Sequence, residues 1–350
     1  MVQALVQAVG MGYRYPSGRI GLEPLDFSVG AGEIVAAIGP NGSGKSTLIR
    51  LLATDLRATV GSLSLLGSPV RGSPRALRRG IAYAPDDPLH LPWLTGEENA
   101  RFFAVLRAPA EGGARDGAAA WDGHIAIRIA ELFRAFHLDE VREVPVAEYS
   151  FGMRRKLLLL EALAATPNLL LLDEPTVGLD PPGTGALRKE VGARAAEGGA
   201  VVIATNDTRE IPYWADRILF LHRGRTVADA PLATLLRQLQ GRTRIEIRLG
   251  GSFGAPDSNP APVGVAIPNR GSPDPALPGM ERIPGVESVE DYGGSIVVES
   301  SRGSALLPEL IGFLLSQGAA IAEIRVREPD LGDLFQEMTG EKLGSAGEEP

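Results

Sequence analysis

The first 240 residues alternate short apolar runs with segments of helical periodicity. Runs typical of strands lie at Ile34–Ile38, 60–66, 80–84, Leu169–Leu172, Ala200–Thr205 and Arg217–His222. Apolar residues at helical spacing lie at Leu48–Leu56, Glu97–Leu106, Ala126–Phe136 and Met153–Ala165. Because apolar strands alternate with helices, the pattern predicts an α/β fold with a mainly parallel sheet covered on both faces. The segment 108–123, rich in small residues, predicts a loop between two helices.

The pattern changes near Gln240, where a small α+β arrangement begins. Strands are predicted at Thr243–Leu249, Val286–Asp291, Ser295–Glu299 and Ala319–Val326, and helices at Ser304–Ser316 and Asp330–Thr339. The segment 250–279 is rich in Pro and Gly and lacks helical periodicity, so we expect a long loop there. The chain is therefore predicted to hold two domains, 1–240 with a helical subdomain at about 90–165, and 241–350.

Composition narrows the classes of function. The 350 residues are 44% hydrophobic and 22% charged, which is enough for two packed cores. A net charge of −8 leaves no overall basic footprint, so we expect no nucleic-acid partner. The absence of cysteine excludes disulfides, thiolate catalysis and cysteine-built metal sites. No stretch supplies the roughly 20 apolar residues of a membrane helix, and the first residues lack the charged region of a signal peptide.

A phosphate-binding motif follows the first apolar run directly. It consists of Gly39, Pro40, Asn41, Gly42, Ser43, Gly44, Lys45, Ser46 and Thr47. The pattern G-x-x-x-x-G-K-[ST] between a strand and a helix predicts a loop whose backbone N–H groups surround phosphate oxygens. The positive end of the helix that follows adds to the attraction. Lys45 is expected to reach the β- and γ-phosphates, and Ser46 to bind Mg²⁺.

Two acids end the buried strand at Leu169–Leu172. Asp173 would lie at the carboxyl end of the sheet, where ligands of such folds bind, and could hold the metal that bridges the phosphates. Glu174 is suited to polarise the attacking water as a general base. Together with the phosphate loop, these acids predict a nucleotide triphosphatase.

Further stretches resemble the ATP-binding subunit of ABC transporters, especially the type-2 exporter group. Tyr149–Arg154 is similar to the family's signature motif and starts a helix; its Ser150 lies 23 residues before Asp173. The resemblance implies that Ser150 and Gly152 bind the γ-phosphate held by the opposite subunit, although a serine at a helix start is most often only an N-cap. Phe151 replaces a glycine that is common in the family. The implied fold is a P-loop ABC cassette with an antiparallel β part, a helical subdomain and a small α+β appendage.

Three other segments carry the same resemblance. Pro175–Asp180 is similar to the D-loop, which crosses the dimer interface in the family. Tyr15 lies 24 residues before Gly39 and resembles the aromatic that stacks on adenine, with Tyr13 as the rival. The stretch 327–335 is similar to a tail found on many type-2 exporter ATPases.

Two positions depart from the family pattern. Asp86 stands where a glutamine is usual, and its oxygen could still reach Mg²⁺ through water. Asn206 stands where the switch histidine is expected. An asparagine can donate a hydrogen bond to the γ-phosphate, but it cannot take up or release a proton near neutral pH. We therefore expect slower hydrolysis with intact binding, or equally a neutral change with hydrolysis driven by Glu174.

The resemblance implies ATP and Mg²⁺ as ligands and two kinds of partner. Two chains, most simply two copies of this one, would enclose two ATP molecules head to tail, and transmembrane permease subunits would be separate polypeptides. The ATPase would then lie on the cytoplasmic face of the membrane, with 84–101 as the docking groove, unless Trp93 is simply a buried loop anchor. Two alternatives remain, a nucleotide-gated module with weak hydrolysis and a soluble ABC ATPase outside transport. The transported substrate is not written in this chain.

Overall fold

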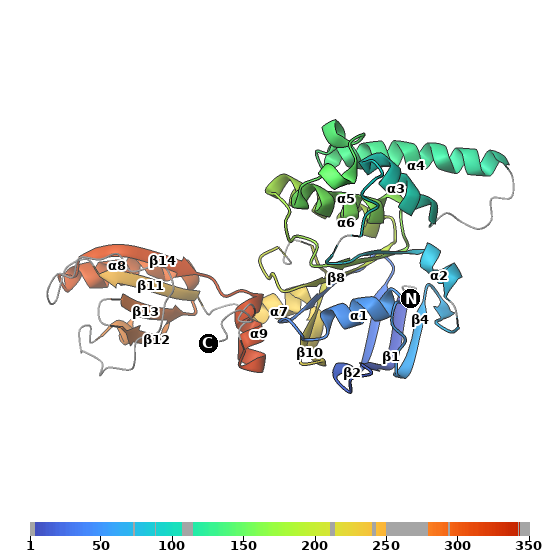
Figure 1. The fold of residues 1–350 in the computed structure, drawn as a ribbon. Coiled ribbons are helices and arrows are strands. Elements are labelled where there is room, and N and C mark those ends of the chain that lie inside the picture. Colours follow the sequence, from blue (N-terminus) through green and yellow to red (C-terminus); the bar gives the residue numbers. More distant parts are fainter. Residues whose placement is uncertain are drawn as a thin grey trace. The chain divides into compact units, whose positions relative to one another are not determined.

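The computed structural model describes residues 4–72, 74–87, 89–106, 115–210, 214–239, 243–249, 279–292, 295–341 and 343, with the backbone alone for 115–122. The chain forms two compact units (Figure 1). One contains residues 1–234 together with 335–350, and the other contains residues 235–334. The last segment of the chain therefore belongs to the same unit as the first.

The first unit is built on a six-stranded sheet with the order β10-β9-β3-β8-β7-β6. Its strands are β3 (Ile34–Ile38), β6 (Ile81–Ala84), β7 (Leu169–Asp173), β8 (Ala200–Thr205), β9 (Arg217–His222) and β10 (Arg225–Pro231). All neighbours pair in parallel except β9 and β10, which form a hairpin. Every residue of β3, β7 and β8 is buried, as the continuous apolar runs predict. The predicted, mainly parallel sheet is confirmed.

A second, antiparallel sheet has the order β2-β1-β4-β5. Its strands are β1 (Ala4–Arg14), β2 (Ile20–Gly30), β4 (Val60–Leu65) and β5 (Ser68–Pro69). The sequence pattern did not predict β1 and β2 as strands. The pairing of β1 with β2 shifts register four times, and these irregularities break the two-residue alternation that would have revealed them.

Helices cover both faces of the six-stranded sheet. Helix α1 (Lys45–Leu52) contacts β7 and β8, and its apolar side chains join one core with the antiparallel sheet. Helix α6 (Pro181–Ala196) contacts β8 and covers the opposite face (Figure 1). The short α2 (Arg75–Arg79) lies beside β6.

Three helices, α3 (Gly96–Leu106), α4 (Arg115–Ala135) and α5 (Phe151–Ala164), contact one another and form the helical part (Figure 1). The loop expected at 108–123 is wrong from Arg115 onward, because α4 already begins there. Its alanine-rich start has high helix propensity, which outweighs the two glycines. Residues 107–114 lie outside the described chain.

The second unit contains a four-stranded antiparallel sheet with the order β12-β13-β11-β14. Its elements are β11 (Thr243–Leu249), β12 (Val286–Asp291), β13 (Ser295–Ser300), α8 (Leu307–Ser316) and β14 (Ile321–Arg327). Ile245, Ile247 and Val298 on one face of the sheet pack with Leu310 and Leu314 of α8. The strands predicted from the sequence are thus confirmed to within two residues, while the loop expected at 250–279 falls almost entirely outside the described residues.

Helices α7 (Leu232–Leu239) and α9 (Leu331–Thr339) lie where the chain leaves the first unit and returns to it. Phe335 of α9 is fully buried, with its ring 5.5 Å from that of Phe220 and 5.9 Å from that of His222 on β9. Beyond the helix, Glu341 pairs with Arg223. The end of the chain is thereby fastened to the first unit by both apolar and ionic contacts.

Candidate active site

The predicted phosphate loop lies between β3 and α1, at the carboxyl end of the six-stranded sheet. Gly42 and Gly44 adopt positive φ angles of 78° and 107°, which favour glycine. A Cβ atom on Gly44 would also lie 2.7 Å from the carbonyl oxygen of Gly21. Ser43, Lys45 and Thr47 are buried. Sterics and backbone conformation therefore both require the glycines that the motif supplies.

Lys45 bends back into its own loop. Its Nζ donates to the carbonyl oxygens of Gly39 and Pro40, at 2.7 and 3.3 Å, and lies 3.6 Å from Oε1 of Glu174. Burial lowers the pKa of the Lys45 ammonium, against the opposing effect of the negative charges of Glu174 and Asp173. A buried ammonium with these partners is available to an incoming anion, which would replace the carbonyls as acceptor.

Glu174 lies directly after β7 in a left-handed conformation with a φ of 45°. Its backbone N donates to the carbonyl of Ala204, at 2.8 Å, which ties it to the end of β8. Its Oε2 accepts hydrogen bonds from the hydroxyl of Thr205, at 3.0 Å, and from the backbone N of Asn206, at 3.3 Å. The structure thus brings Lys45, Glu174 and Asn206 together, and adds Thr205, which sequence reasoning missed.

Asp173 is 3% exposed at the end of β7. Burial raises the pKa of its carboxyl group to about 6; the charge of Glu174 adds to the rise, and a hydrogen bond with Ser46 opposes it. Its Oδ1 is buried and, among the described residues, has no hydrogen-bond partner. The hydroxyl oxygen of Ser43 is likewise buried and has no hydrogen-bond partner among the described residues. The Asp173 carboxylate beside the Ser46 hydroxyl is an oxygen donor set that suits Mg²⁺.

A protein-only metal cage is not formed in the described residues, since no group of three or more His, Cys, Asp or Glu side chains is placed to hold an ion. Mg²⁺ in nucleotide sites is held by one or two protein ligands together with substrate phosphates, so Ser46 and Asp173 fit that arrangement. Asp86, the third predicted metal residue, has a side chain that is 66% exposed and lies 3.9 Å from the guanidinium of Arg155.

The predicted signature residues lie at the start of α5, in the helical part. Ser150 is the N-cap, and its hydroxyl accepts a hydrogen bond from the backbone N of Met153, at 3.2 Å. Gly152 approaches the D-loop closely, because a Cβ there would lie 3.1 Å from the carbonyl of Gly178. The ring of Phe151 is half-exposed and contacts the same Gly178. The start of α5 and the segment Pro175–Asp180 therefore lie side by side.

Tyr15 is joined to the phosphate-loop helix. Its hydroxyl lies 3.0 Å from that of Thr47, its ring packs edge-on against Tyr13, and the guanidinium of Arg19 lies 4.8 Å from the ring centre. The residue is half-buried. The tyrosine predicted to contact adenine is thus fixed next to the loop that would hold the phosphates.

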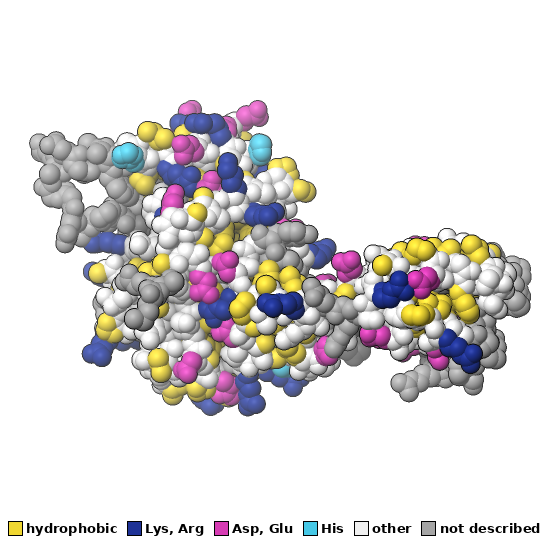
Figure 2. Space-filling model, turned by 180° about the vertical axis from the view of Figure 1, so that it is seen from behind, with side chains coloured by type: hydrophobic (Ala, Val, Ile, Leu, Met, Phe, Trp, Pro, Cys, Tyr) yellow, Lys and Arg dark blue, Asp and Glu magenta, His cyan; other side chains and the backbone are white. Residues whose placement is uncertain are grey.

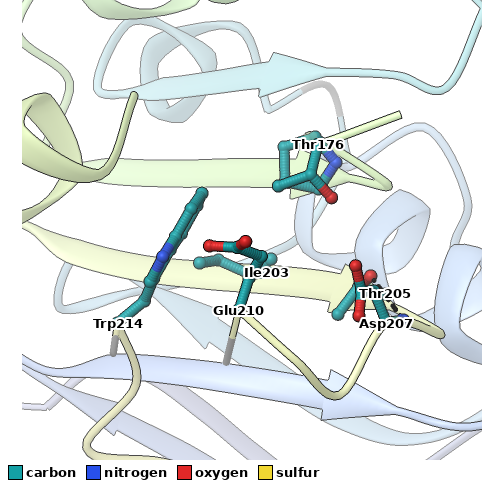
Figure 3. Close-up of a pocket in the computed structure, with 7 residues that line it drawn as sticks. Thr176, Ile203, Thr205, Asp207, Glu210 and Trp214 are labelled. Carbon is teal, nitrogen blue, oxygen red and sulfur yellow. Dashed lines mark hydrogen bonds between the residues drawn. The ribbon is translucent and has the colours of Figure 1, made fainter. Parts of the chain in front are cut away.

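A small pocket adjoins Thr205 at the end of β8 (Figure 3). Its lining is formed by Pro175, Thr176, Ile203, Thr205, Asp207, Glu210 and Trp214. Figure 3 shows the indole of Trp214 and the carboxylate of Glu210 on one side of Thr205, whose hydroxyl accepts a hydrogen bond from the backbone N of Asp207, at 3.1 Å. The Thr205 hydroxyl is therefore hydrogen-bonded both to the carboxylate of Glu174 and to the backbone of Asp207.

Sequence reasoning also missed Arg155, the largest fully buried side chain described. It lies on α5 and donates hydrogen bonds to backbone carbonyls of two loops. An arginine in a helical stretch carries no sequence signal of this kind, because its acceptors are main-chain atoms that only the fold brings together.

The raised pKa of Asp173 generates a prediction for the chain without nucleotide or metal. The pKa of Asp173 is about 6 in the folded chain, above the ordinary value of 3.8. The folded state therefore favours the protonated carboxyl group, and the free energy of unfolding falls as the pH rises through about 6. We expect Asp173→Asn to raise the Tm at pH 8, and the gain to shrink at pH 5.5, as measured by thermal unfolding in a chelator. Asp139→Asn, at an exposed position, serves as the control. An equal gain at both pH values would contradict the assignment.

Comparisons with known proteins agree with this geometry. Residues 22–177 match the family model described as ABC transporter. The daunorubicin resistance ATP-binding protein DrrA2 of Streptomyces coeruleorubidus is 32% identical over 343 residues, which cover 96% of this chain and 95% of the relative. The fluoroquinolones export ATP-binding protein of Mycobacterium tuberculosis is 32% identical over 251 residues, 71% of this chain and 78% of the relative.

Solved structures give the same result. The ATP-binding subunit of an ABC transporter superposes with a TM-score of 0.60 at 30% identity, covering 67% of this chain and 92% of the other. A dimeric ATP-binding cassette with bound ADP and phosphate superposes with a TM-score of 0.57 at 21% identity, covering 65% and 98%, which supports the fold. The phosphate loop, the paired acids and the matches along nearly the whole chain lead to one assignment: this chain belongs to the ABC transporter family and is one of its ATP-binding ATPase subunits.

Proposed function

We propose that this chain hydrolyses ATP as the motor subunit of an exporter whose membrane-spanning subunits are separate polypeptides. The observation that carries the proposal is the convergence of Lys45, Asp173 and Glu174 at the carboxyl ends of β3 and β7. No helix in the described part of the chain is long and apolar enough to cross a membrane. Relatives are named for daunorubicin resistance and fluoroquinolone export, so we propose a drug-like organic molecule as the substrate.

Each residue of the convergence has a distinct role in this proposal. The N–H groups of the phosphate loop surround the β- and γ-phosphates, and Lys45 exchanges its carbonyl partners for phosphate oxygens. Ser46 and Asp173 would hold Mg²⁺, which neutralises charge on the phosphates. Glu174 orients a water molecule in line with the γ-phosphate and accepts its proton. Thr205 and the backbone N of Asn206 fix the carboxylate for that task.

A second copy of the chain would complete the site. Ser150 is exposed at the start of α5, and its hydroxyl accepts the hydrogen bond that caps that helix. Phe151 and Val177, half-exposed beside it, add apolar surface. A symmetric pair would place each Ser150 and Gly152 against the nucleotide of the other copy and form two identical composite sites.

The membrane subunits would dock on the helical part of the first unit. We name as the docking surface the exposed apolar side chains Leu89, Trp93, Phe102, Val105 and Leu106. Trp93 is 72% exposed, so the alternative that it is a buried loop anchor is wrong. All five lie within residues 89–106, and exposed apolar side chains that form a contiguous patch mark binding surfaces. Figure 2 shows basic and acidic side chains interspersed over the face in view. Because the chain would drive separate membrane subunits with ATP, we propose that it lies on the cytoplasmic face of the membrane.

One observation favours a second candidate, a nucleotide-gated module with weak hydrolysis. Asn206 occupies the switch position, and its contact to Glu174 is made by the backbone N. A side chain that cannot titrate near pH 7 offers no proton relay at this position. Turnover measurements on the purified chain separate the two candidates.

Replacing the general base tests the proposed function directly. We expect Glu174→Gln to lower kcat at least about 100-fold, because it removes the proton acceptor, and to trap an ATP-bound dimer. Steady-state turnover with Mg²⁺-ATP and light scattering with and without ATP measure both effects. Residual turnover close to that of the unaltered chain would exclude Glu174 as the base, and a monomer under all conditions would exclude the paired site.

The hydroxyl of Thr205 generates a second prediction. Thr205→Val keeps the shape of the side chain but removes the donor to Glu174, so kcat should fall roughly tenfold, the value of one hydrogen bond. Thr205→Ser, which keeps the hydroxyl, is the matched control and should retain turnover. If both variants behave alike, Thr205 contributes packing rather than orientation.

The switch position generates a third prediction. We expect Asn206→His to raise kcat several-fold, because an imidazole can exchange a proton near neutral pH. Asn206→Gln changes the side-chain length without adding a titrating group and should not increase the rate. An unchanged rate in Asn206→His would mean that Glu174 alone limits hydrolysis.

A further inference from the structure

Arg155 bonds two loops, one that follows β6 and one that begins with Glu174. It is 1% exposed on α5, five residues after the exposed Ser150. Its Nη1 donates to the carbonyl oxygens of Pro85, at 3.1 Å, and Asp86, which follow β6. Its Nη2 donates to the carbonyl of Glu174, at 2.6 Å. A fourth bond, from Nε, reaches the carbonyl of Val177 in the D-loop, at 3.3 Å.

Burying a guanidinium this completely is costly unless its donors are satisfied. Here one side chain satisfies carbonyls that would otherwise be difficult to pair in two irregular loops. Charge-assisted bonds of this kind are about twice as strong as neutral ones. The two loops are therefore held to each other through Arg155 and to α5 by the same side chain.

The loop after β6 leads directly to the docking surface. Leu89 and Trp93 follow Asp86 within a few residues and are exposed. Between them, the imidazole of His90 lies 3.1 Å from the carboxylate of Glu161 and 3.0 Å from the carbonyl of Arg154, both on α5. The residues after β6 are thus bonded to α5 at two points, one of which is Arg155.

The other loop begins with Glu174 itself. Its carboxylate is held by Thr205 and Asn206, while its carbonyl is held by Arg155. The position of that carbonyl fixes the orientation of the peptide group that follows a strained, left-handed residue. A shift of the guanidinium would therefore reorient Glu174 relative to the phosphate loop.

We propose that Arg155 is a positioning residue that couples the loop leading to the docking surface with the peptide carbonyl of Glu174, so that the membrane partner and the nucleotide sense each other through this guanidinium. The inference rests on the proposed function. A planar fork with five donors can bond several carbonyls in fixed directions, whereas an ammonium acts as a compact point charge. Lysine at this position should keep the charge and lose the coupling.

The test compares Arg155→Lys and Arg155→Gln with the control Arg134→Lys. Arg134 lies exposed in the last turn of α4, outside the loops that Arg155 bonds. We measure kcat, the Kd for ATP and amide hydrogen exchange at residues 85–87 and 89–94 with and without Mg²⁺-ATP. Both Arg155 variants should lower kcat at least about tenfold, as expected for a misplaced catalytic group, with the ATP Kd unchanged within about twofold.

Hydrogen exchange separates coupling from a merely structural role. Since coupling is reciprocal, ATP should alter exchange at 85–87 and 89–94 in the unaltered chain and in Arg134→Lys, and this response should vanish in the Arg155 variants. A preserved response, or a preserved kcat, would overturn the proposal. So would a loss of ATP affinity parallel to the loss of kcat.

Glutamine is the second variant because it leaves no unpaired buried charge if lysine prevents folding. If neither variant folds, Arg155 is a folding determinant and the proposal is overturned. Glu174→Gln is measured beside the Arg155 variants. If turnover does not depend on Glu174, the proposed function is wrong; if it does and the Arg155 variants behave like the unaltered chain, only the coupling proposal is wrong.

Discussion

The charge balance between Lys45 and the two acids that end β7 determines how the rest of the site is arranged. A buried ammonium must have partners, and in this chain they are two carbonyls of its own loop and one oxygen of Glu174. That arrangement keeps the phosphate loop closed around its lysine. It also holds Glu174 at the site before any substrate is present. At Lys45 the nucleotide would therefore replace partners that the ammonium already has, rather than meet an unpaired charge.

The same balance explains why Asp173 and Glu174, adjacent in sequence, differ in surroundings. Asp173 is the last residue of the buried strand and carries an unpaired oxygen. Glu174 follows in a left-handed conformation, and its own side chain contacts Thr205 and Lys45. One acid is therefore suited to a metal ion and the other to a water molecule. A single backbone conformation separates two roles that the residue types alone do not distinguish.

The sequence was sufficient to predict features that are formed by residues close together in the chain. The phosphate loop, the acids after β7 and the buried parallel strands are each encoded within a few neighbouring residues. The strands β1 and β2 were not predicted, because register shifts in their pairing disturb the alternation of apolar and polar positions. Arg155 and Thr205 were not predicted either. Their partners are a carboxylate and main-chain carbonyls from distant segments, and no local pattern records such contacts.

The return of the chain to the first unit has a consequence for the second unit. Phe335 packs on β9, and Glu341 pairs with Arg223, after about 100 residues that form a separate compact body. The second unit is thus an insertion with two attachment points rather than a tail with one. After a single proteolytic cut inside the second unit, the C-terminal fragment would still be held to the first unit through Phe335. Truncation of all residues after 240 would remove Phe335 and uncover the rings of Phe220 and His222. The boundary of a minimal, stable ATPase therefore cannot be drawn at one position in the sequence.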